Sequence, residues 1–444
     1  MASSHLSRTF DQVGNRTTWT LSVWIKRTGI GGQQNFFGSF PQASDYERIM
    51  FNNDKIYIAE VAGSSTNWEC ETDARYRDVN AWYHLVYRHD TTQASANDRI
   101  RLYMNGVQQS FGTNSQPAQN RGTAINTADV HKIGMGASSE YTDCEMAHFH
   151  WCDGQSYAPT EFGETDSTTG IWKPKVSPSV SYGTNGFFLK FDNAANMGLD
   201  SGGGAHNWTT NGSIIQNKDT PNNVFCTMNS LDNYWQASTF ANTSNTITTS
   251  AAKENYNTST LAMSSNDAGK YYCEVKIVSA SAYSLVGLAD KLTTSATSNF
   301  KNHAYGYAYD SSNGNIINNN SSSSYGNSYT TGDIIGIAVD TDNNKLYFSK
   351  NGTWQNSGDP TSGSTGTGAI SISSTTTNGY YIFASGTRHN DSLQASWNFG
   401  NGYFGTTAVA SAQNPDDGVG IFEYDVPAGY RALCTKSLNA QEYN

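Results

Sequence analysis

The sequence predicts an all-β chain that contains two antiparallel sandwiches in tandem. Apolar and polar residues alternate over short runs, and Asn-Gly pairs close two of these runs. The first run spans residues 81–107, and a near copy of its order returns at residues 333–354. Ser, Thr, Asn and Gly fill the gaps, and Ala/Glu/Lys/Leu runs that favour helices are absent. A repeated hairpin pattern in a helix-poor chain indicates one kind of sandwich built twice.

Length and charge narrow the class of protein further. A chain of 444 residues exceeds what one core ordinarily holds, so we expect at least two domains. The formal net charge of -11 argues against nucleic acid as a partner, because phosphates would be repelled. No apolar run is long enough to span a bilayer, so we expect no membrane insertion. The first residues lack the apolar core of an export signal.

The cysteines are sparse and scattered. Six cysteines over this length do not make a disulfide framework, and the sequence has no CxxC pair for structural zinc. Assembly in a reducing cytoplasm would keep them as free thiols. We therefore expect six free thiols.

The first strong strand is expected at residues 17–25. Trp19, Leu21, Val23 and Ile25 share one face of it, which is typical of a half-buried strand. Further strands of the first half are expected at residues 35–40, 48–51, 55–61, 130–136, 144–152 and 186–191. Gly, Pro, Asn and Asp separate them, and no helix lies between, so the pattern favours a sandwich over a parallel sheet.

The hairpin at residues 81–107 is the clearest local prediction. Its second strand places Ile100, Leu102 and Met104 on one face. Asn105-Gly106 then supplies the positive φ angles that a two-residue turn requires.

The second half has the same character after an irregular stretch. Residues 192–221 are rich in Gly and Asn, and we interpret them as a connector. Strands of the second half are expected at residues 269–278, 283–289, 303–309, 333–340 and 345–350. The predicted domains are residues 1–191, the connector 192–221, a second sandwich 222–403, and a closing segment 404–444.

Several separated phrases of the first half resemble a known fold. HLSRTF, TLSVWIKRT, AWYHLVYRHDTTQASANDRIRLYMNGV and FGETDSTTGIWKPK, followed by SYGTNGFFLKF, resemble a concanavalin A-like, laminin-G-like sandwich. They are similar to the variant found in virion proteins of tailed bacteriophages, many of them marine phages of the cyanophage type. The resemblance covers nearly all of residues 1–191.

Phrases of the second half resemble another family. GKYYCEVKI, SLVGLAD, YGYAYD, YTTGDIIGIAVDTDNNKLYFSKNGTW and SWNFGNGYF resemble a SPRY domain, whose fold is also a concanavalin-like sandwich. GIFEYDVPAGYRALCTKSLNA is similar to the closing segment of the same phage proteins. Together the resemblances imply two tandem concanavalin A-like (jelly-roll) sandwiches.

We expect no catalytic residue and a protein that is not an enzyme. Retaining hydrolases need two carboxylates about 5 Å apart. The closest approach, Glu140, Asp143 and Glu145, has a spacing that puts Glu140 on the opposite face of a strand from the other two. A polar turn before a strand explains these residues better.

A metal site has two candidate forms. His148, His150 and Cys152 alternate on one predicted strand, but strand residues two apart are roughly 7 Å apart, too far for three to converge on one ion. No cofactor is required, and calcium is the metal we consider, through loop carboxylates of the first half. The calcium candidates are Asp90, Asp98 and Asp143.

Sugar recognition is the remaining chemistry. Such sites stack exposed aromatic rings on sugars and read hydroxyls with Asn, Asp and Arg. The candidates are Tyr46, Trp68, Trp235, Tyr325, Tyr329, and the run Arg388, His389, Asn390 and Asp391. Each aromatic among them also has an ordinary role as a core residue.

The resemblance implies a structural protein on the virion surface, of the tail-fibre or tail-adhesin type. It would assemble in the bacterial cytoplasm with other virion proteins, as a homotrimer, and bind a host surface polysaccharide or receptor without catalysis. Several copies would strengthen a weak single-site affinity. The alternatives are capsid decoration, a head fibre or a purely structural tail component. A polysaccharide depolymerase is a third class, and it lacks the carboxylate pair.

Overall fold

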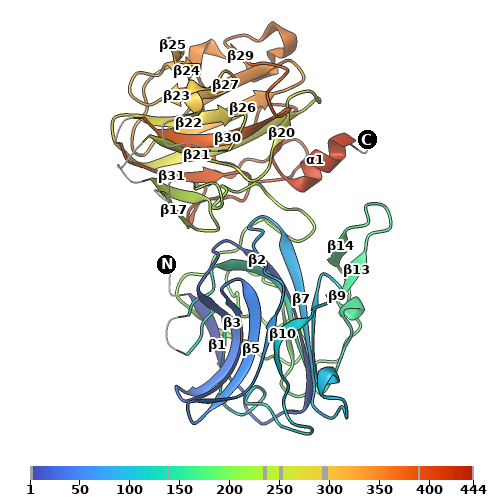
Figure 1. The fold of residues 1–444 in the computed structure, drawn as a ribbon. Helices are drawn as coiled ribbons and strands as arrows, with labels where there is room; N and C mark the ends of the chain where they lie inside the picture. Colours follow the sequence, from blue (N-terminus) through green and yellow to red (C-terminus); the bar gives the residue numbers. More distant parts are fainter. Residues whose placement is uncertain are drawn as a thin grey trace. The chain divides into compact units, whose positions relative to one another are not determined.

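The computed structural model describes residues 4–137, 140–233, 238–249, 254–292, 299–388 and 391–442. It divides the chain into two compact units, residues 1–216 and 217–444. Antiparallel strands dominate both units (Figure 1), which confirms the predicted all-β class.

The first unit contains two facing sheets. The strands of one sheet are β1 (His5–Thr9), β3 (Gln33–Gln42), β4 (Asp45–Asn52), β5 (Lys55–Ala62), β6 (Ser65–Thr72), β10 (Phe111–Ser115), β11 (Val130–Ile133) and β16 (Thr209–Asn211). The strands of the other are β2 (Thr18–Arg27), β7 (Trp82–Asp90), β8 (Ile100–Met104), β9 (Val107–Gln108), β12 (Cys144–Asp153) and β15 (Phe187–Leu189). Their orders are β10-β6-β5-β4-β3-β11-β1-β16 and β15-β12-β2-β7-β8-β9. A short ribbon, β13 (Gly163–Thr165) with β14 (Trp172–Pro174), and the 3-10 turns η1 (Ala96–Asp98) and η2 (Pro159–Glu161) complete it.

Apolar side chains from both sheets fill the space between them. The predicted inward face of β2 is confirmed, because Trp19 and Leu21 are fully buried in one core cluster with Phe37 and Ile49 of the other sheet. Trp19 contacts Trp151 of β12 with ring centroids 4.5 Å apart. Figure 1 shows the two layers, with β2 and β7 in one and β1, β3 and β5 in the other.

The predicted hairpin of β7 and β8 is also confirmed. Leu85 pairs with Met104, and Asn105 and Gly106 take φ angles of 50° and 80° in the turn. Positive φ at both positions is the reason that Asn-Gly suits this turn.

The strand β12 is less regular than its sequence suggests. Its pairing with β2 shifts register between Ala147 and His150, and His148 has a φ of 48°. The predicted strict alternation of His148, His150 and Cys152 is therefore interrupted by a bulge, where one extra residue re-aims the side chains. The His150 ring stacks on Phe188 with centroids 3.9 Å apart.

The division between the units differs from the predicted connector. The strand β16 lies inside residues 192–221 and pairs with β1, through Leu6 with Thr210. Trp208, in the same stretch, is 3% exposed in the first core. Residues 192–216 thus belong to the first sandwich, because they supply both a strand and a core side chain.

The second unit also contains two sheets. One sheet has β17 (Ser238–Ala241), β18 (Thr246–Thr249), β21 (Lys270–Ala280), β26 (Ile334–Asp340), β27 (Lys345–Lys350), β28 (Thr353–Trp354), β29 (Ile370–Ser371), β31 (Leu393–Asn398) and β34 (Arg431–Ala432). The other has β19 (Asn255–Thr258), β20 (Met263–Ser264), β22 (Ser284–Ala289), β23 (Tyr307–Asp310), β24 (Ile316–Asn318), β25 (Ser321–Ser323) and β30 (Tyr380–Thr387). The main paths are β17-β18-β31-β21-β26-β27-β28 and β19-β30-β22-β23-β24-β25. The remaining elements are β32 (Tyr403–Phe404), β33 (Thr407–Ala408), η3 (Phe300–Asn302), η4 (Gln355–Ser357), η5 (Pro360–Thr365) and α1 (Thr435–Glu442).

The predicted second copy of the first hairpin pattern, at residues 333–354, is confirmed in this unit. The strands β26 and β27 pair antiparallel, and Asn351 and Gly352 after them take φ angles of 49° and 80°. Val275 and Ile337 of one sheet and Phe383 of the other are fully buried in a shared core.

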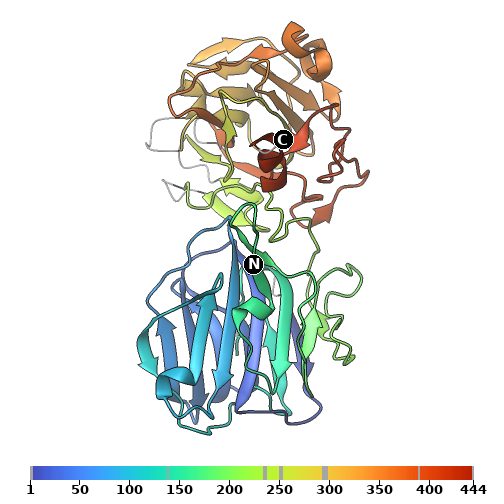
Figure 2. The ribbon, with the colours of Figure 1, turned by 90° about the vertical axis from the view of Figure 1, so that its right-hand side faces the viewer.

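The C-terminal segment covers the outer face of one sheet. Tyr272, Ala338 and Tyr347 are cross-strand neighbours on the face turned away from the main core. Phe422 and Tyr430 pack against them, and β34 pairs in parallel with β21. Figure 2 shows this part of the chain, in red, beside the sheets of the second unit. The predicted closing segment is therefore part of the second sandwich.

All six cysteines are free thiols, as expected. Within the described ranges, no helix has both the length and the hydropathy needed to cross a membrane.

Candidate functional site

One end of the second unit brings together three side chains of complementary chemistry. The register pairs Ser284 with Thr387 and Leu285 with Asp310, so the start of β22, the end of β23 and the end of β30 meet there. Tyr283 precedes β22 and Arg388 follows β30. Sheet pairing, rather than sequence proximity, thus assembles Tyr283, Asp310 and Arg388.

The Arg388 guanidinium is held from two sides. Its Nη1 atom lies 3.1 Å from Asp310 Oδ2, and its Cζ atom lies 4.4 Å from the centre of the Tyr283 ring. The Asp310 side chain is fully buried, whereas a quarter of the Arg388 side chain is exposed. A guanidinium fixed by a buried carboxylate and an aromatic face is pre-organised for recognition.

Two polar atoms of this pair lack hydrogen bonds. Arg388 Nε and Asp310 Oδ2 are buried, and neither has a hydrogen-bond partner in the described part of the chain. Buried polar atoms are nearly always hydrogen-bonded, by protein, water or ligand. The exposed quarter of the Arg388 side chain is therefore the part of this pair that a ligand can reach.

A hollow of about 470 Å³ lies at this end of the strands. Its lining includes Tyr283, Ser311, Ser312, Thr330 and Lys350. Hydroxyl groups and a lysine at the rim suit a polar ligand rather than an apolar one. Lys350 itself is engaged, with Nζ 2.9 Å from the Ser328 carbonyl oxygen and 3.1 Å from Asp333 Oδ2.

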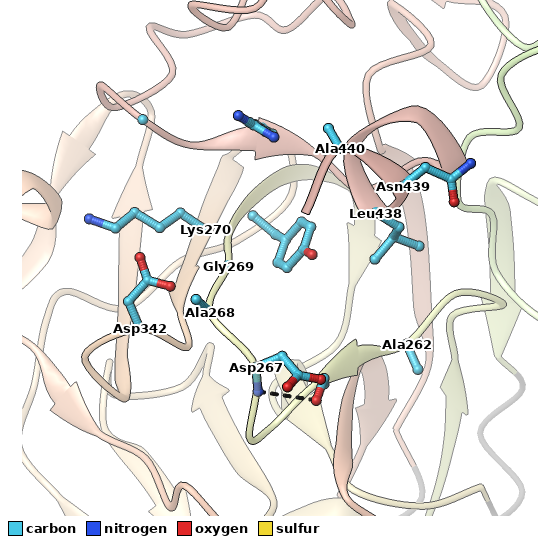
Figure 3. Close-up of a pocket in the computed structure, with 13 residues that line it drawn as sticks. Ala262, Asp267, Ala268, Gly269, Lys270, Asp342, Leu438, Asn439 and Ala440 are labelled. Carbon is cyan, nitrogen blue, oxygen red and sulfur yellow. Dashed lines mark hydrogen bonds between the residues drawn. The ribbon is translucent and has the colours of Figure 1, made fainter. Parts of the chain in front are cut away.

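A larger hollow of about 1130 Å³ lies at the opposite end of β21 (Figure 3). The residues that line it include Asp267, Lys270, Tyr271, Asp342, Arg431 and Asn439. They come from the turn before β21, the β26–β27 turn, β34 and α1. These two hollows therefore lie at opposite ends of the same strand.

Three of the predicted sugar-stacking residues are buried, so the expectation of exposed rings is wrong for them. Trp68, Tyr325 and Tyr329 are 2%, 8% and 3% exposed. Trp68 Nε1 donates a hydrogen bond to Glu60, and the Tyr329 hydroxyl donates one to the Tyr309 carbonyl oxygen. Aromatic residues with a satisfied polar atom pack well in a core, which is the role these residues have.

The other sugar-site candidates are placed differently. Tyr46 is half-buried, and the Arg48 guanidinium lies over its ring, 5.1 Å from the centre. Asp391 is half-buried, three positions after Arg388. Trp235, His389 and Asn390 lie outside the described residues. Arg388 thus contacts Tyr283, which lines the hollow of about 470 Å³, and Tyr329 is a sequence-predicted residue that lines the hollow itself.

The calcium candidates do not converge. Asp90 accepts hydrogen bonds from Thr92 and Gln93, and Asp98 pairs with Arg101 at 2.5 Å. Burial raises the pKa of Asp143. Across the described ranges, no group of three or more His, Cys, Asp or Glu side chains could hold a metal ion.

Sequence patterns missed the buried carboxylates. Glu274 on β21 is fully buried and accepts hydrogen bonds from the backbone N–H groups of Glu423 and Tyr424, both at 2.8 Å. Glu47 and Glu60 are direct cross-strand partners in the first core, and Arg121 pairs with Glu60 at 2.7 Å. The partners are far apart in sequence, so no local motif marks these residues.

Comparison with known families agrees with the two sandwiches. Residues 3–153 match the concanavalin A-like lectin/glucanases superfamily, and residues 270–368 match the SPRY domain family. The chain carries a laminin-G-like and a SPRY domain. The predicted domain types are therefore confirmed, and Arg388 follows the part of the chain that matches SPRY.

Curated relatives match a short part of the second unit. Ran-binding protein 9 of Danio rerio is 36% identical over 87 residues, which is 19% of this chain and 14% of that protein. Ran-binding protein 9 of Homo sapiens is 37% identical over 87 residues, which is 19% of this chain and 12% of that protein. The chain thus spans less than a sixth of the length of these relatives.

Solved structures share local similarity with the chain. The SPRY domain of human HERC1 is 15% identical, with a TM-score of 0.28, over 34% of this chain and 87% of that structure. A putative carbohydrate binding protein from Bacteroides ovatus is 13% identical, with a TM-score of 0.33, over 48% of this chain and 57% of that structure.

Proposed function

We propose that this chain is a non-catalytic recognition protein whose second sandwich binds a polar group of its ligand at Arg388. The observation that carries the proposal is the guanidinium that Asp310 and Tyr283 hold in place while a quarter of the Arg388 side chain stays exposed. A ligand oxygen is the natural acceptor for it, because guanidinium groups bind carboxylate and hydroxyl oxygens through fixed donors. Laminin-G-like and SPRY domains typically serve binding rather than catalysis.

The ligand that we propose is a surface glycan or receptor of a bacterial host. The resemblance of residues 1–191 to tailed-phage virion proteins supports this setting, with the chain displayed on the virion as an attachment protein. A single polar hollow of about 470 Å³ gives modest affinity, which several copies on one particle would raise by avidity. Immunogold labelling of particles of the phage that encodes the chain tests the setting. Gold on neither head nor tail would contradict it.

The ligand site is tested by substitution of Arg388. Full-length protein is first screened on arrays of bacterial surface glycans and of peptides. Arg388→Ala is expected to lower the affinity for the selected ligand at least tenfold, because it removes the donors beside Tyr283, which lines the hollow. Arg388→Lys, which keeps the charge and loses the planar fork, should recover only part of the loss.

A matched control separates this site from general charge effects. Arg75 is exposed in the first unit, so Arg75→Ala removes the same kind of group elsewhere and should leave binding unchanged. Equal affinities for wild type and Arg388→Ala, measured by isothermal titration calorimetry, would refute the site. Release of reducing sugar from a bound polysaccharide would refute the non-catalytic role.

A further inference from the structure

We propose that Arg48, on the outer face of the eight-stranded sheet of the first unit, binds the acidic group of an oligosaccharide. The site lies in the other unit from Arg388, so it is independent of the function proposed above. Ile49 and Phe51 of β4 are buried in the core of the first unit. Because side chains alternate along a strand, Arg48 lies on the opposite face.

Arg48 is the arginine without a polar partner. Every other arginine in the described part of the chain forms an ion pair or donates a hydrogen bond, whereas the Arg48 guanidinium does neither. Its Nε atom is buried, but the side chain as a whole is half-buried, so the two Nη groups are accessible. A ligand that reaches them meets N–H donors that the described residues leave unused.

Two tyrosine rings hold this guanidinium in place. Arg48 Cζ lies 5.1 Å from the centre of the Tyr46 ring and 5.7 Å from that of Tyr57. Tyr57 is itself fixed, because its hydroxyl donates a hydrogen bond to Glu69 at 2.6 Å. Aromatic rings attract a guanidinium without using its N–H donors. The donors are therefore positioned for an oxyanion, which accepts two parallel hydrogen bonds from arginine.

The strand register places the neighbours of Arg48 in one row across the sheet. Gly38 and Ala59 are its direct cross-strand partners, and both have little or no side chain. Glu69 is the next partner beyond Ala59, so its backbone is two strand spacings, about 10 Å, from that of Arg48. The carboxylate of Glu69 accepts the Tyr57 hydroxyl and forms no ion pair with Arg48, although the structure describes both residues. The row therefore offers free donors at Arg48 and an acceptor further along.

Two other cations of this face already have partners. Lys55 Nζ lies 3.3 Å from Glu71 Oε2. Lys132 Nζ lies 3.3 Å from the Gly136 carbonyl oxygen. Arg48 is therefore the cation of this row that an incoming oxyanion can neutralise.

The face of a sheet favours a sugar over a peptide as the carrier of the acidic group. The backbone of β4 is paired on both sides, so a peptide could not add a strand there. Recognition falls to side chains, and the half-buried rings of Tyr46 and Tyr57 add apolar surface against which a sugar ring can pack. A polymer of phosphates is disfavoured by the net charge of -11.

The experiment probes one printed array with the full chain. The array carries uronic-acid oligosaccharides, sulfated oligosaccharides and the neutral parents of both. We expect signal on acidic members and none on their neutral parents, because the Arg48 donors require an oxyanion. Signal on either acidic set supports the site, and the comparison identifies carboxylate or sulfate as the bound group. Isothermal titration calorimetry then gives the Kd of the strongest member.

Substitutions assign that binding to Arg48. Arg48→Gln should weaken the Kd at least tenfold, because it removes the charge and the planar fork, and Arg48→Lys should recover part of the loss. Arg75→Gln makes the same charge change at an exposed position of the same unit and should leave the Kd unchanged. Thermal melting by circular dichroism checks that each variant folds. Arg48→Lys, which should still bind several-fold more weakly than wild type, keeps the test valid if Arg48→Gln does not fold.

The outcomes separate the two sites. Arg388→Ala is expected to keep full affinity for the acidic oligosaccharide, so failure of the Arg388 site leaves this one standing. Unchanged affinity in the folded Arg48 variants would overturn the assignment. So would an array on which the acidic members gave no signal above that of their neutral parents.

Discussion

At the scale of single residues, Glu274 carries an ionisable group in the outer layer of the second sandwich. Its carboxylate accepts hydrogen bonds from Glu423 and Tyr424 N–H, from the Tyr272 hydroxyl at 3.1 Å and from Asn398 Nδ2 at 3.3 Å. Burial outweighs these four bonds and raises its pKa from 4.5 to about 7. The charged form is thus costly in the folded state although it is fully hydrogen-bonded.

We predict that the stability of the second unit falls as pH rises from 5 to 8. Because the folded pKa of Glu274 lies above the unfolded value, the folded state binds more protons in this interval, and stability is lost through pH 7. The loss is about 3 kcal/mol for a shift of this size. Glu274→Gln cannot titrate, so it should flatten the dependence in calorimetry at pH 5 and 8. Parallel pH profiles of the two proteins would contradict the assignment.

The pKa of Asp54, in the first unit, is shifted in the direction opposite to that of Glu274. Asp54 pairs with Arg27 and Arg77, both at 2.8 Å, and accepts the Gly31 N–H. Burial opposes its ionisation, but these donors together lower its pKa. The Arg27 side chain is fully buried, so its charge depends on Asp54 for compensation.

We predict that Asp54→Asn destabilises the first unit by about 3–5 kcal/mol, because it leaves the Arg27 charge buried without a counter-ion. Urea denaturation at pH 7 measures the change. Asp98→Asn is the control: its partner Arg101 is about a third exposed, so the cost should stay below about 1 kcal/mol. Similar costs for the two substitutions would show that burial does not matter here.

At the scale of elements, the two glycines that flank the hairpin of β26 and β27 differ in what surrounds them. A Cβ atom on Gly352, at a φ of +80°, would lie 2.6 Å from the Tyr424 ring. A Cβ on Gly332, at a φ of +93°, would meet nothing within 4 Å. The two glycines therefore share the backbone requirement and differ in packing.

We predict that Gly332→Ala costs about 1 kcal/mol, the usual penalty of a side chain at positive φ. Gly352→Ala should cost at least about 1 kcal/mol more, because the C-terminal segment that carries Tyr424 must shift. Chemical denaturation of both variants gives the comparison. Equal costs would mean that Tyr424 moves aside freely.

Sequence alone could predict the elements better than the site. Alternation around Trp19 and the Asn105-Gly106 pair are local signals, and both were confirmed. The bulge at His148 left no such signal, because it depends on the partner strand β2. Trp68 was misplaced on the surface because residue type does not reveal which face of a strand is covered. The partners of Glu274 lie 149 and 150 residues away, beyond any local pattern.

At the scale of the whole molecule, each unit has its own core, and the boundary falls between residues 216 and 217. Residues 192–216 supply β16 and the buried Trp208 to the first unit. A fragment of residues 1–216 should therefore fold alone, whereas one of residues 1–191 should be markedly destabilised.

Circular dichroism with thermal melting tests this prediction. The 1–216 fragment should melt cooperatively, and the 1–191 fragment should melt at least 10 °C lower or not fold, since it loses a strand and a tryptophan from its core. Equal melting temperatures would mean that the first domain ends at residue 191, as the sequence predicted.

The outer layer formed by the C-terminal segment also bears on how the protein is made. The first unit is complete once residue 216 has left the ribosome, so it can fold while synthesis continues. The second unit is complete only after residues 430–432 have been made, because Tyr430 and β34 cover the face of Tyr272 and Tyr347. A prematurely terminated chain would carry a finished first sandwich attached to a bare aromatic sheet. Chaperones and proteases recognise such surfaces, so a chain that stops before β34 is expected to be degraded.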